Sequence, residues 1–197
     1  MEQIAGVDRY AVATQSGDGR SLVRVFDSRT DQRLFDLTPY GANFTGGVQV
    51  STGDINGDAV PDIVIAPGAG RYALVLAFDG RNGSLITSFN AFPEPYNSGV
   101  DVAVGNVQGD NRNEIVVSTL NGGMTVAVFA ADAATPTEFE SVNEFSPYED
   151  SAPNVGLRLT TADIDRDGVE DIITVPRPGW RPQVAVHDVS DLSLIHI

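Results

Sequence analysis

The sequence predicts an all-β protein, a β-propeller of four-stranded antiparallel blades. The prediction depends on a repeated segment, on short strand-like runs separated by turn residues, and on the lack of any window of about 11 residues with a sustained apolar helical face. Four short strands in about 50 residues, repeated along the chain, are typical of propeller blades. A β-sandwich would explain the strands but not their regular spacing.

The repeat is visible in three segments that begin at Val48, Val100 and Leu157. Each is preceded by a glycine, runs as a short strand into an acidic or amide-rich loop, and ends in a β-branched strand. A Pro-Tyr pair lies upstream of each segment. The repeat places a partial blade at 1–47, complete blades at 48–99 and 100–156, and a second partial blade at 157–191.

The blade at 48–99 shows the strand pattern clearly. Strands are expected at 48–52, 63–66, 73–78 and 84–89, where apolar residues alternate or form a short run between turns. Residues 9–14 and 22–26 match the second and third of these strands. The chain is therefore expected to begin within a blade.

The chain thus holds about three and a half blades, whereas closed propellers have about four to eight. We expect it to be a fragment of a larger propeller that begins and ends within a blade. Residues 192–197 read like the translated end of a sequencing adapter, and we interpret them as a non-native tail.

Composition excludes several classes of function. The chain carries 27 acidic residues and 12 basic ones, for a net charge of -15. All 12 basic residues are Arg, and there is no Lys. Such a surface repels phosphate backbones, so no nucleic-acid partner is expected. With no Cys and two His, the chain offers neither a thiolate nor a multi-histidine metal site. No apolar stretch is long enough for membrane insertion.

A nine-residue acidic loop follows the first strand of each unit and carries the main chemical signal. In the first and third loops, oxygen-bearing side chains occupy positions 1, 3, 5 and 9, and the carbonyl at position 7 adds a further candidate ligand. This set of hard oxygen donors suits Ca²⁺, which takes about six to eight of them. The candidate ligands are Asp54, Asn56, Asp58, Val60 and Asp62 in the first loop, and Asp163, Asp165, Asp167, Val169 and Asp171 in the third.

The middle loop is a weaker candidate for the same metal. Its positions are Asn106, Gln108, Asp110, Arg112 and Glu114, of which two are acidic. Because fewer negative ligands bind calcium less tightly, the expected order of affinity is third loop, first loop, middle loop.

An alternative interpretation remains open at this stage. The Asp and Asn side chains can simply form Asx turns between strands. Against this, three or four carboxylates crowded into one short loop repel one another unless a cation neutralises them.

The loops, within four-stranded repeats, resemble the FG-GAP and VCBS-type repeats found in the propeller of integrin α subunits and in many bacterial surface proteins. The elements at 45–47, 66–70 and 23–27 resemble the bacterial branch. The resemblance covers roughly residues 9–191 and implies a calcium-binding propeller, with ligation by the Asp and Asn residues of the first and third loops. The middle loop departs from the pattern at positions 1, 3 and 9.

Two residues outside the loops are candidate ligand contacts. Trp180 and Arg181 lie in a proline-rich segment, where the indole ring could stack on a sugar or anchor a protein. Packing between blades is the favoured interpretation of Trp180. His187, which occupies the repeat position of Phe78 and Phe129, is expected to be a packed residue.

Two functions are consistent with these observations. The first is a calcium-binding adhesion or binding scaffold, located outside the cell or on its surface, whose loops contact a protein or a glycan. The second is a propeller-type polysaccharide lyase or hydrolase with structural calcium. The scaffold is favoured over an enzyme because the sequence contains no catalytic signature.

Overall fold

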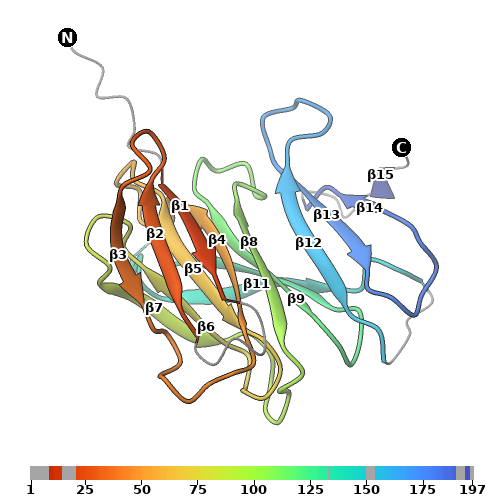
Figure 1. The fold of residues 1–197 in the computed structure, drawn as a ribbon. Helices are drawn as coiled ribbons and strands as arrows, with labels where there is room; N and C mark the ends of the chain where they lie inside the picture. Colours follow the sequence, from red (N-terminus) through yellow and green to blue (C-terminus); the bar gives the residue numbers. More distant parts are fainter. Residues whose placement is uncertain (1–8, 15–20, 133, 150–153, 190–193, 196–197) are drawn as a thin grey trace.

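The computed structural model describes residues 9–14, 21–132, 134–149, 154–189 and 194–195. These residues form fifteen β-strands in four antiparallel sheets and contain no helix (Figure 1). The described part of the chain accordingly offers no apolar helix of membrane-spanning length. The predicted all-β class is confirmed, and so are the antiparallel sheets, three of which have four strands among the described residues.

Each sheet is a meander in which consecutive strands are hydrogen-bonded neighbours. The first sheet has the strands β1 (Arg9–Ala13), β2 (Val23–Asp27) and β3 (Arg33–Leu37). The second has β4 (Val48–Gly53), β5 (Asp62–Pro67), β6 (Leu74–Phe78) and β7 (Leu85–Asn90). The third has β8 (Val100–Gly105), β9 (Glu114–Thr119), β10 (Val126–Ala131) and β11 (Phe139–Phe145). The fourth has β12 (Leu157–Ala162), β13 (Asp171–Pro176), β14 (Ala185–His187) and β15 (Leu194–Ile195).

The segment expected to be a non-native tail contributes one short strand. Leu194–Ile195 pairs with β14, whereas residues 190–193 and 196–197 lie outside the described residues. The first eight residues of the expected partial blade at 1–47 also lie outside them.

The second strands of the second and third sheets are buried on both faces, which explains the β-branched apolar run in each of them. All six residues of β5 and all six of β9 are buried. Because strand side chains alternate between faces, Ile63 packs toward the first sheet while Val64 packs toward the third. In β9, Val116 and Val117 likewise belong to different core clusters. The core therefore lies between sheets, in three separate layers.

The sheets are arranged around their first strands. β4, β8 and β12 are neighbours in space (Figure 1), and the second strands β5 and β9 also contact the first strands of the following sheets, β8 and β12. β1 contacts β4 in the way that β5 contacts β8. β1 thus holds the place of a second strand, as its sequence predicts.

Candidate metal sites

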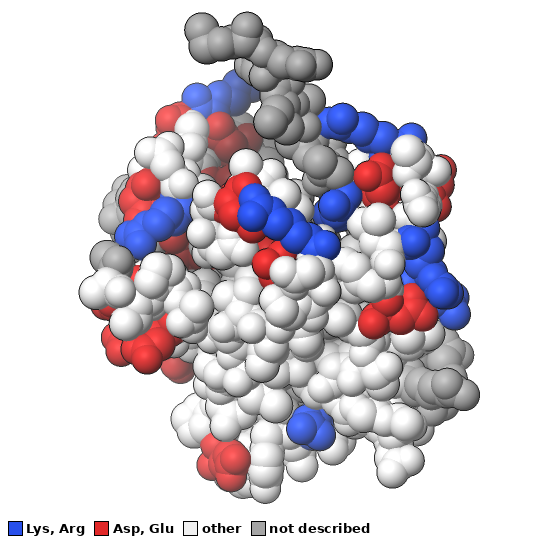
Figure 2. All heavy atoms as spheres, turned by 90° about the vertical axis from the view of Figure 1, so that its left-hand side faces the viewer, with Lys and Arg blue, Asp and Glu red and all other residues white. Residues whose placement is uncertain are grey.

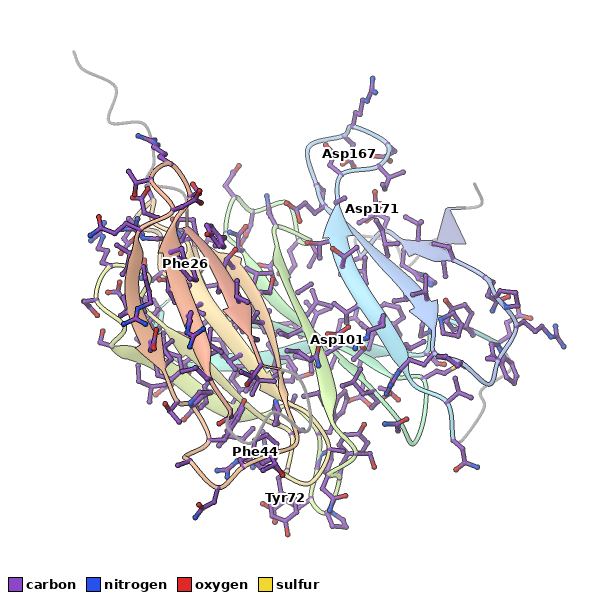
Figure 3. The ribbon with its side chains drawn as sticks, viewed as in Figure 1. Phe26, Phe44, Tyr72, Asp101, Asp167 and Asp171 are labelled. Atoms are coloured by element: carbon purple, nitrogen blue, oxygen red, sulfur yellow. The ribbon has the colours of Figure 1, made fainter. Side chains whose placement is uncertain are left out.

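The three acidic loops lie at the same end of the sheets. They connect β4 to β5, β8 to β9 and β12 to β13, and Figure 3 shows Asp167 and Asp171 at this end of the fourth sheet. One connection in each repeat therefore brings the candidate ligands to one face of the molecule.

The loops share one backbone conformation. Positions 4 and 6 have positive φ in all three, although only some of these residues are glycine. Arg166, at position 4 of the third loop, has φ 68°, and Ala59, at position 6 of the first, has φ 64°. A non-glycine residue there costs about 1–2 kcal/mol, so other interactions must hold the curl in place.

Side chains at positions 1 and 9 supply some of those interactions. The position-1 oxygen accepts a hydrogen bond from the position-4 backbone amide, at 2.7 Å for Asp54, 2.9 Å for Asn106 and 2.6 Å for Asp163. The position-9 carboxylate accepts one from the position-2 amide, at 3.1 Å for Asp62, 2.9 Å for Glu114 and 2.9 Å for Asp171. The position-1 bonds are local bonds of the Asx type that the alternative interpretation expects, whereas the position-9 bonds span seven residues and close the loop.

In the first loop, neighbouring groups partly neutralise the carboxylates. Arg81 places its Nε 3.1 Å from Oδ2 of Asp58 and donates from Nη2 to the Asp58 carbonyl at 2.7 Å. Asn56 donates from Nδ2 to Oδ1 of Asp62 at 3.2 Å, which leaves its own Oδ1 to accept the Asp58 amide. No motif in the sequence predicts that Arg81, in the β6–β7 hairpin turn, would reach this loop.

The middle loop is neutralised by its own arginine. Arg112 donates to Oδ2 of Asp110 from both Nε, at 3.1 Å, and Nη2, at 2.9 Å. The position-3 residue Gln108 contributes its backbone amide to Glu114. Because one carboxylate is paired with Arg112 and the other accepts two amides, this loop is the least suited of the three to bind a cation.

The third loop brings three acidic residues together. One carboxylate oxygen from each of Asp163, Asp165 and Asp171 lies within 4.8 Å of the others. No arginine pairs with these groups among the residues that the structure describes, and the loop's own Arg166 donates only its backbone amide to Asp163. Asp167 accepts the Val169 amide at 2.8 Å and lies outside the group of three. The largest unneutralised acidic cluster is therefore here.

Burial and mutual repulsion act on the position-9 acids. The pKa of Asp62 is raised to about 6, mainly by burial and in smaller part by the charges of Asp58 and Asp54, against the lowering effect of its hydrogen bonds from the Gly80 and Ile55 amides. Burial raises the pKa of Glu114 to about 7, opposed by its bonds to the Gln108 and Val107 amides. Burial also raises the pKa of Asp171, again with repulsion from acidic neighbours. A cation would offset the cost of keeping these groups charged.

The donor set fits calcium rather than a softer metal. Every side chain at positions 1, 3, 5 and 9 of the third loop is a carboxylate, and neither Cys nor His is present in the loop. Asp165 and Asp171 each accept a hydrogen bond at one oxygen, whereas Asp163 accepts backbone amides at both of its oxygens. The carbonyl oxygens of Val60 and Val169 remain candidate ligands.

Trp180 and Arg181 lie away from the loops. Trp180 is half-buried against the core cluster that contains Leu157 and Tyr148, as the packing interpretation expects. The Arg181 guanidinium is 5.9 Å from the centre of the indole ring. His187 is buried with its ring 5.2 Å from that of Phe145, which agrees with a packed residue.

A polar group between the first strands was missed by the sequence reasoning. Gln49, Asp101 and Arg158 are each the second residue of a first strand, so the repeat itself places them side by side. Arg158 donates from Nη1 to Oε1 of Gln49 at 2.6 Å and to Oδ1 of Asp101 at 3.3 Å. Aligning the three strands would have found this group.

Comparison with known proteins bears on the fold. No protein-family model matches the chain, and no curated protein sequence matches it. Among solved structures the chain is similar to the quinohemoprotein alcohol dehydrogenase ADHIIG from Pseudomonas putida HK5, with a TM-score of 0.51 and 16% sequence identity. The similarity covers 95% of this chain and 32% of that one, so the chain spans about a third of the dehydrogenase's length. At this identity the similarity concerns the fold alone, and the fold is all-β and propeller-like.

Proposed function

We propose that the chain is a calcium-stabilised propeller segment of the FG-GAP and VCBS type, acting as a binding or adhesion scaffold outside the cell or on its surface. In this proposal the four sheets are blades, about three and a half of them belonging to a larger propeller. One observation carries the calcium assignment: the cluster of Asp163, Asp165 and Asp171, within 4.8 Å and without a paired arginine among the described residues.

Calcium would act through the stability of the native loops. The third-loop carboxylates converge only when the backbone of the loop is folded, so the folded chain would bind the cation and the unfolded chain would not. Such binding adds about 2.7 kcal/mol per site when calcium is in about hundredfold excess over Kd. Sites with Kd of about 10⁻⁴–10⁻³ M suit the calcium concentrations found outside cells.

The test is thermal unfolding of the chain in millimolar calcium and after chelation with EGTA. We expect the unfolding temperature to fall by several degrees on chelation and to recover when calcium is restored. Magnesium at the same concentration is the control, because its stricter octahedral geometry should stabilise the loops less. An unfolding temperature that is the same with calcium and with EGTA would refute the proposal.

The alternative function, a polysaccharide lyase or hydrolase, has one observation in its favour. A cavity of about 610 Å³ beside the first strands is lined by Arg158 and Arg177 together with Gln49, Ser98 and Asn121. Hydrolysis by the usual mechanism needs a pair of carboxylates flanking the bond. The described lining of this cavity contains neither Asp nor Glu. We therefore keep the scaffold as the proposed function, and an assay for glycan degradation in calcium separates the two.

A further inference from the structure

A second cavity, of about 580 Å³, opens at the end of the second sheet opposite the acidic loops. It lies between the β5–β6 connection and the segment that leads from β7 to β8. Its polar lining comes from Arg71, Tyr72, Asn90, Glu94 and Asn97. Figure 3 shows Tyr72 at the end of the molecule opposite Asp167. The volume lies in the range of about 300–1,000 Å³ that is usual for small-molecule sites.

The two walls of this cavity are joined by the backbone. Gly70 donates its amide to the Asn97 carbonyl at 2.9 Å, and Arg71 forms a bridge with Ser98. The Tyr96 hydroxyl lies 2.8 Å from the Gly99 carbonyl oxygen and 2.7 Å from that of Asn121. A ligand would therefore meet a site that is already formed.

Arg71 lies in the lining with unused hydrogen-bonding capacity. Its Nε is buried and has no hydrogen-bond partner among the described residues. Its guanidinium is 5.2 Å from the centre of the Tyr40 ring, which is itself buried. No carboxylate of the described chain forms an ion pair with it. A buried donor without a partner is costly, and because the Nε is closed to solvent, a ligand would contact Arg71 through the part of the side chain that lines the cavity.

Tyr72 supplies an apolar surface beside these donors. Its side chain is 45% exposed, whereas Tyr40 and Tyr148 are buried. An exposed aromatic ring in the lining of the cavity offers a flat surface to which the C–H face of a sugar ring can pack.

Three further side chains in the lining are free to bind. Asn90, Glu94 and Asn97 are exposed, and their side chains form no hydrogen bond with the part of the chain that the structure describes. Together they offer two amides, which both donate and accept, and one carboxylate, which accepts from two hydroxyls. The vicinal hydroxyls of a sugar present matching donors and acceptors at close spacing.

We propose that this cavity binds one or two sugar rings of a glycan, with Tyr72 as the stacking surface and Arg71, Asn90, Glu94 and Asn97 as the polar contacts. The surroundings favour a sugar over a charged peptide. In Figure 2 charged side chains gather toward the end with the acidic loops, and the opposite end is mostly uncharged on the face shown. The inference rests on the scaffold function proposed above, to which it gives a partner class, but it does not depend on calcium.

The experiment uses the whole chain in millimolar calcium on a printed array of oligosaccharides that includes neutral, amino and acidic sugars. The oligosaccharide with the strongest signal is then titrated by calorimetry against the variants Tyr72→Ala, Tyr72→Phe and Glu94→Gln. Leu85→Ala is the matched control, because Leu85 is 55% exposed and lies at the far end of β7 from Asn90. All three positions are exposed, and thermal unfolding checks that each of the four variants is folded.

We expect Tyr72→Ala and Glu94→Gln to weaken binding by about tenfold or more, and Tyr72→Phe and Leu85→Ala to change it by less than about twofold. The proposal would be overturned if the unsubstituted chain gave no stronger signal on the array than the Tyr72→Ala variant. So would a peptide from a displayed library that binds in a Tyr72-dependent way while the array stays silent. Calcium affinity is measured on the same variants: unchanged calcium binding with lost glycan binding separates failure of this site from failure of the proposed function.

Discussion

The hydroxyl of Tyr148 lies 3.0 Å from the carbonyl oxygen of Thr174, in the second strand of the sheet that follows. Tyr40 occupies the same repeat position, and its hydroxyl lies 3.0 Å from the carbonyl oxygen of Ile65 in β5. Both tyrosines belong to the Pro-Tyr pairs that mark the repeat. In each case the connection that enters a sheet is fastened to that sheet's buried second strand.

Removing one of these hydroxyls should destabilise the fold. We expect Tyr148→Phe and Tyr40→Phe each to lower the free energy of unfolding by about 1 kcal/mol, because a buried carbonyl loses a partner while ring packing is kept. Urea denaturation measures the change. Tyr72→Phe, at an exposed tyrosine, is the control and should leave stability unchanged. Equal stability of all three variants would show that the hydroxyls contribute nothing.

The three loops should differ in their contribution to calcium binding. We expect Asp165→Ala to lower the calcium-dependent rise in unfolding temperature most, Asp58→Ala less, and Asp110→Ala least. The reason is neutralisation: Arg81 already pairs with Asp58 and Arg112 with Asp110, whereas Asp165 has no arginine partner in the described chain. Calcium titration calorimetry of each variant measures the difference. Equal losses for Asp165→Ala and Asp110→Ala would contradict this order.

Substitution of Gly80 should affect both the stability of the fold and calcium binding by the first loop. Its amide donates to Oδ1 of Asp62 at 3.1 Å, and a Cβ at Gly80 would collide with the Pro61 carbonyl oxygen. We expect Gly80→Ala to destabilise the fold by about 1–3 kcal/mol and to weaken calcium binding at the first loop, because the loop must shift. Gly83, with φ 73° in the same turn, gives the matched variant: Gly83→Ala should destabilise the fold without changing calcium affinity. A Gly80→Ala protein with native calcium affinity would disprove the connection.

His187 should make stability sensitive to acid. Burial lowers the pKa of His187, against a smaller opposing effect from its hydrogen bond to the backbone of Pro147. The stability contributed by the neutral ring is therefore fully present above the ordinary pKa of about 6.5 and is lost as pH falls through the lowered value.

The substitution His187→Phe, which introduces the residue found at this repeat position in the neighbouring sheets, should remove that loss. We expect the free energy of unfolding to fall less for the variant than for the unsubstituted chain when the pH is lowered from 8 to 5. Urea denaturation at both pH values measures the difference. A difference in stability between the two proteins that is the same at pH 8 and pH 5 would exclude this role for His187.

The sequence predicts those features of the fold that recur in every repeat. The strand positions of the second sheet and the matching of residues 9–14 to a second strand follow from alternation and spacing, since a one-residue shift would move every buried side chain to the wrong face. The position of the acidic loops at one end follows from the same regularity.

Contacts between different sheets or distant turns could not be predicted in this way. The pairing of Arg81 with Asp58 depends on how the β6–β7 turn folds back over the first loop, and this cannot be predicted from the two residue types. The cavity beside Tyr72 is formed by two connections whose sequences have no periodicity. The trio of Gln49, Asp101 and Arg158 is an intermediate case, because the repeat aligns these residues although their side chains differ.

The acidic loops lie at the opposite end from Tyr72, so negative charge is unevenly distributed along the length of the molecule. Near a negatively charged surface, an excess of anionic groups at one pole produces a torque that turns this pole away. The molecule would then approach with the Tyr72 end leading. Bound cations would reduce this torque. The orientation in which the molecule approaches a charged surface should therefore depend on the ions in solution, even where its affinity for a ligand does not.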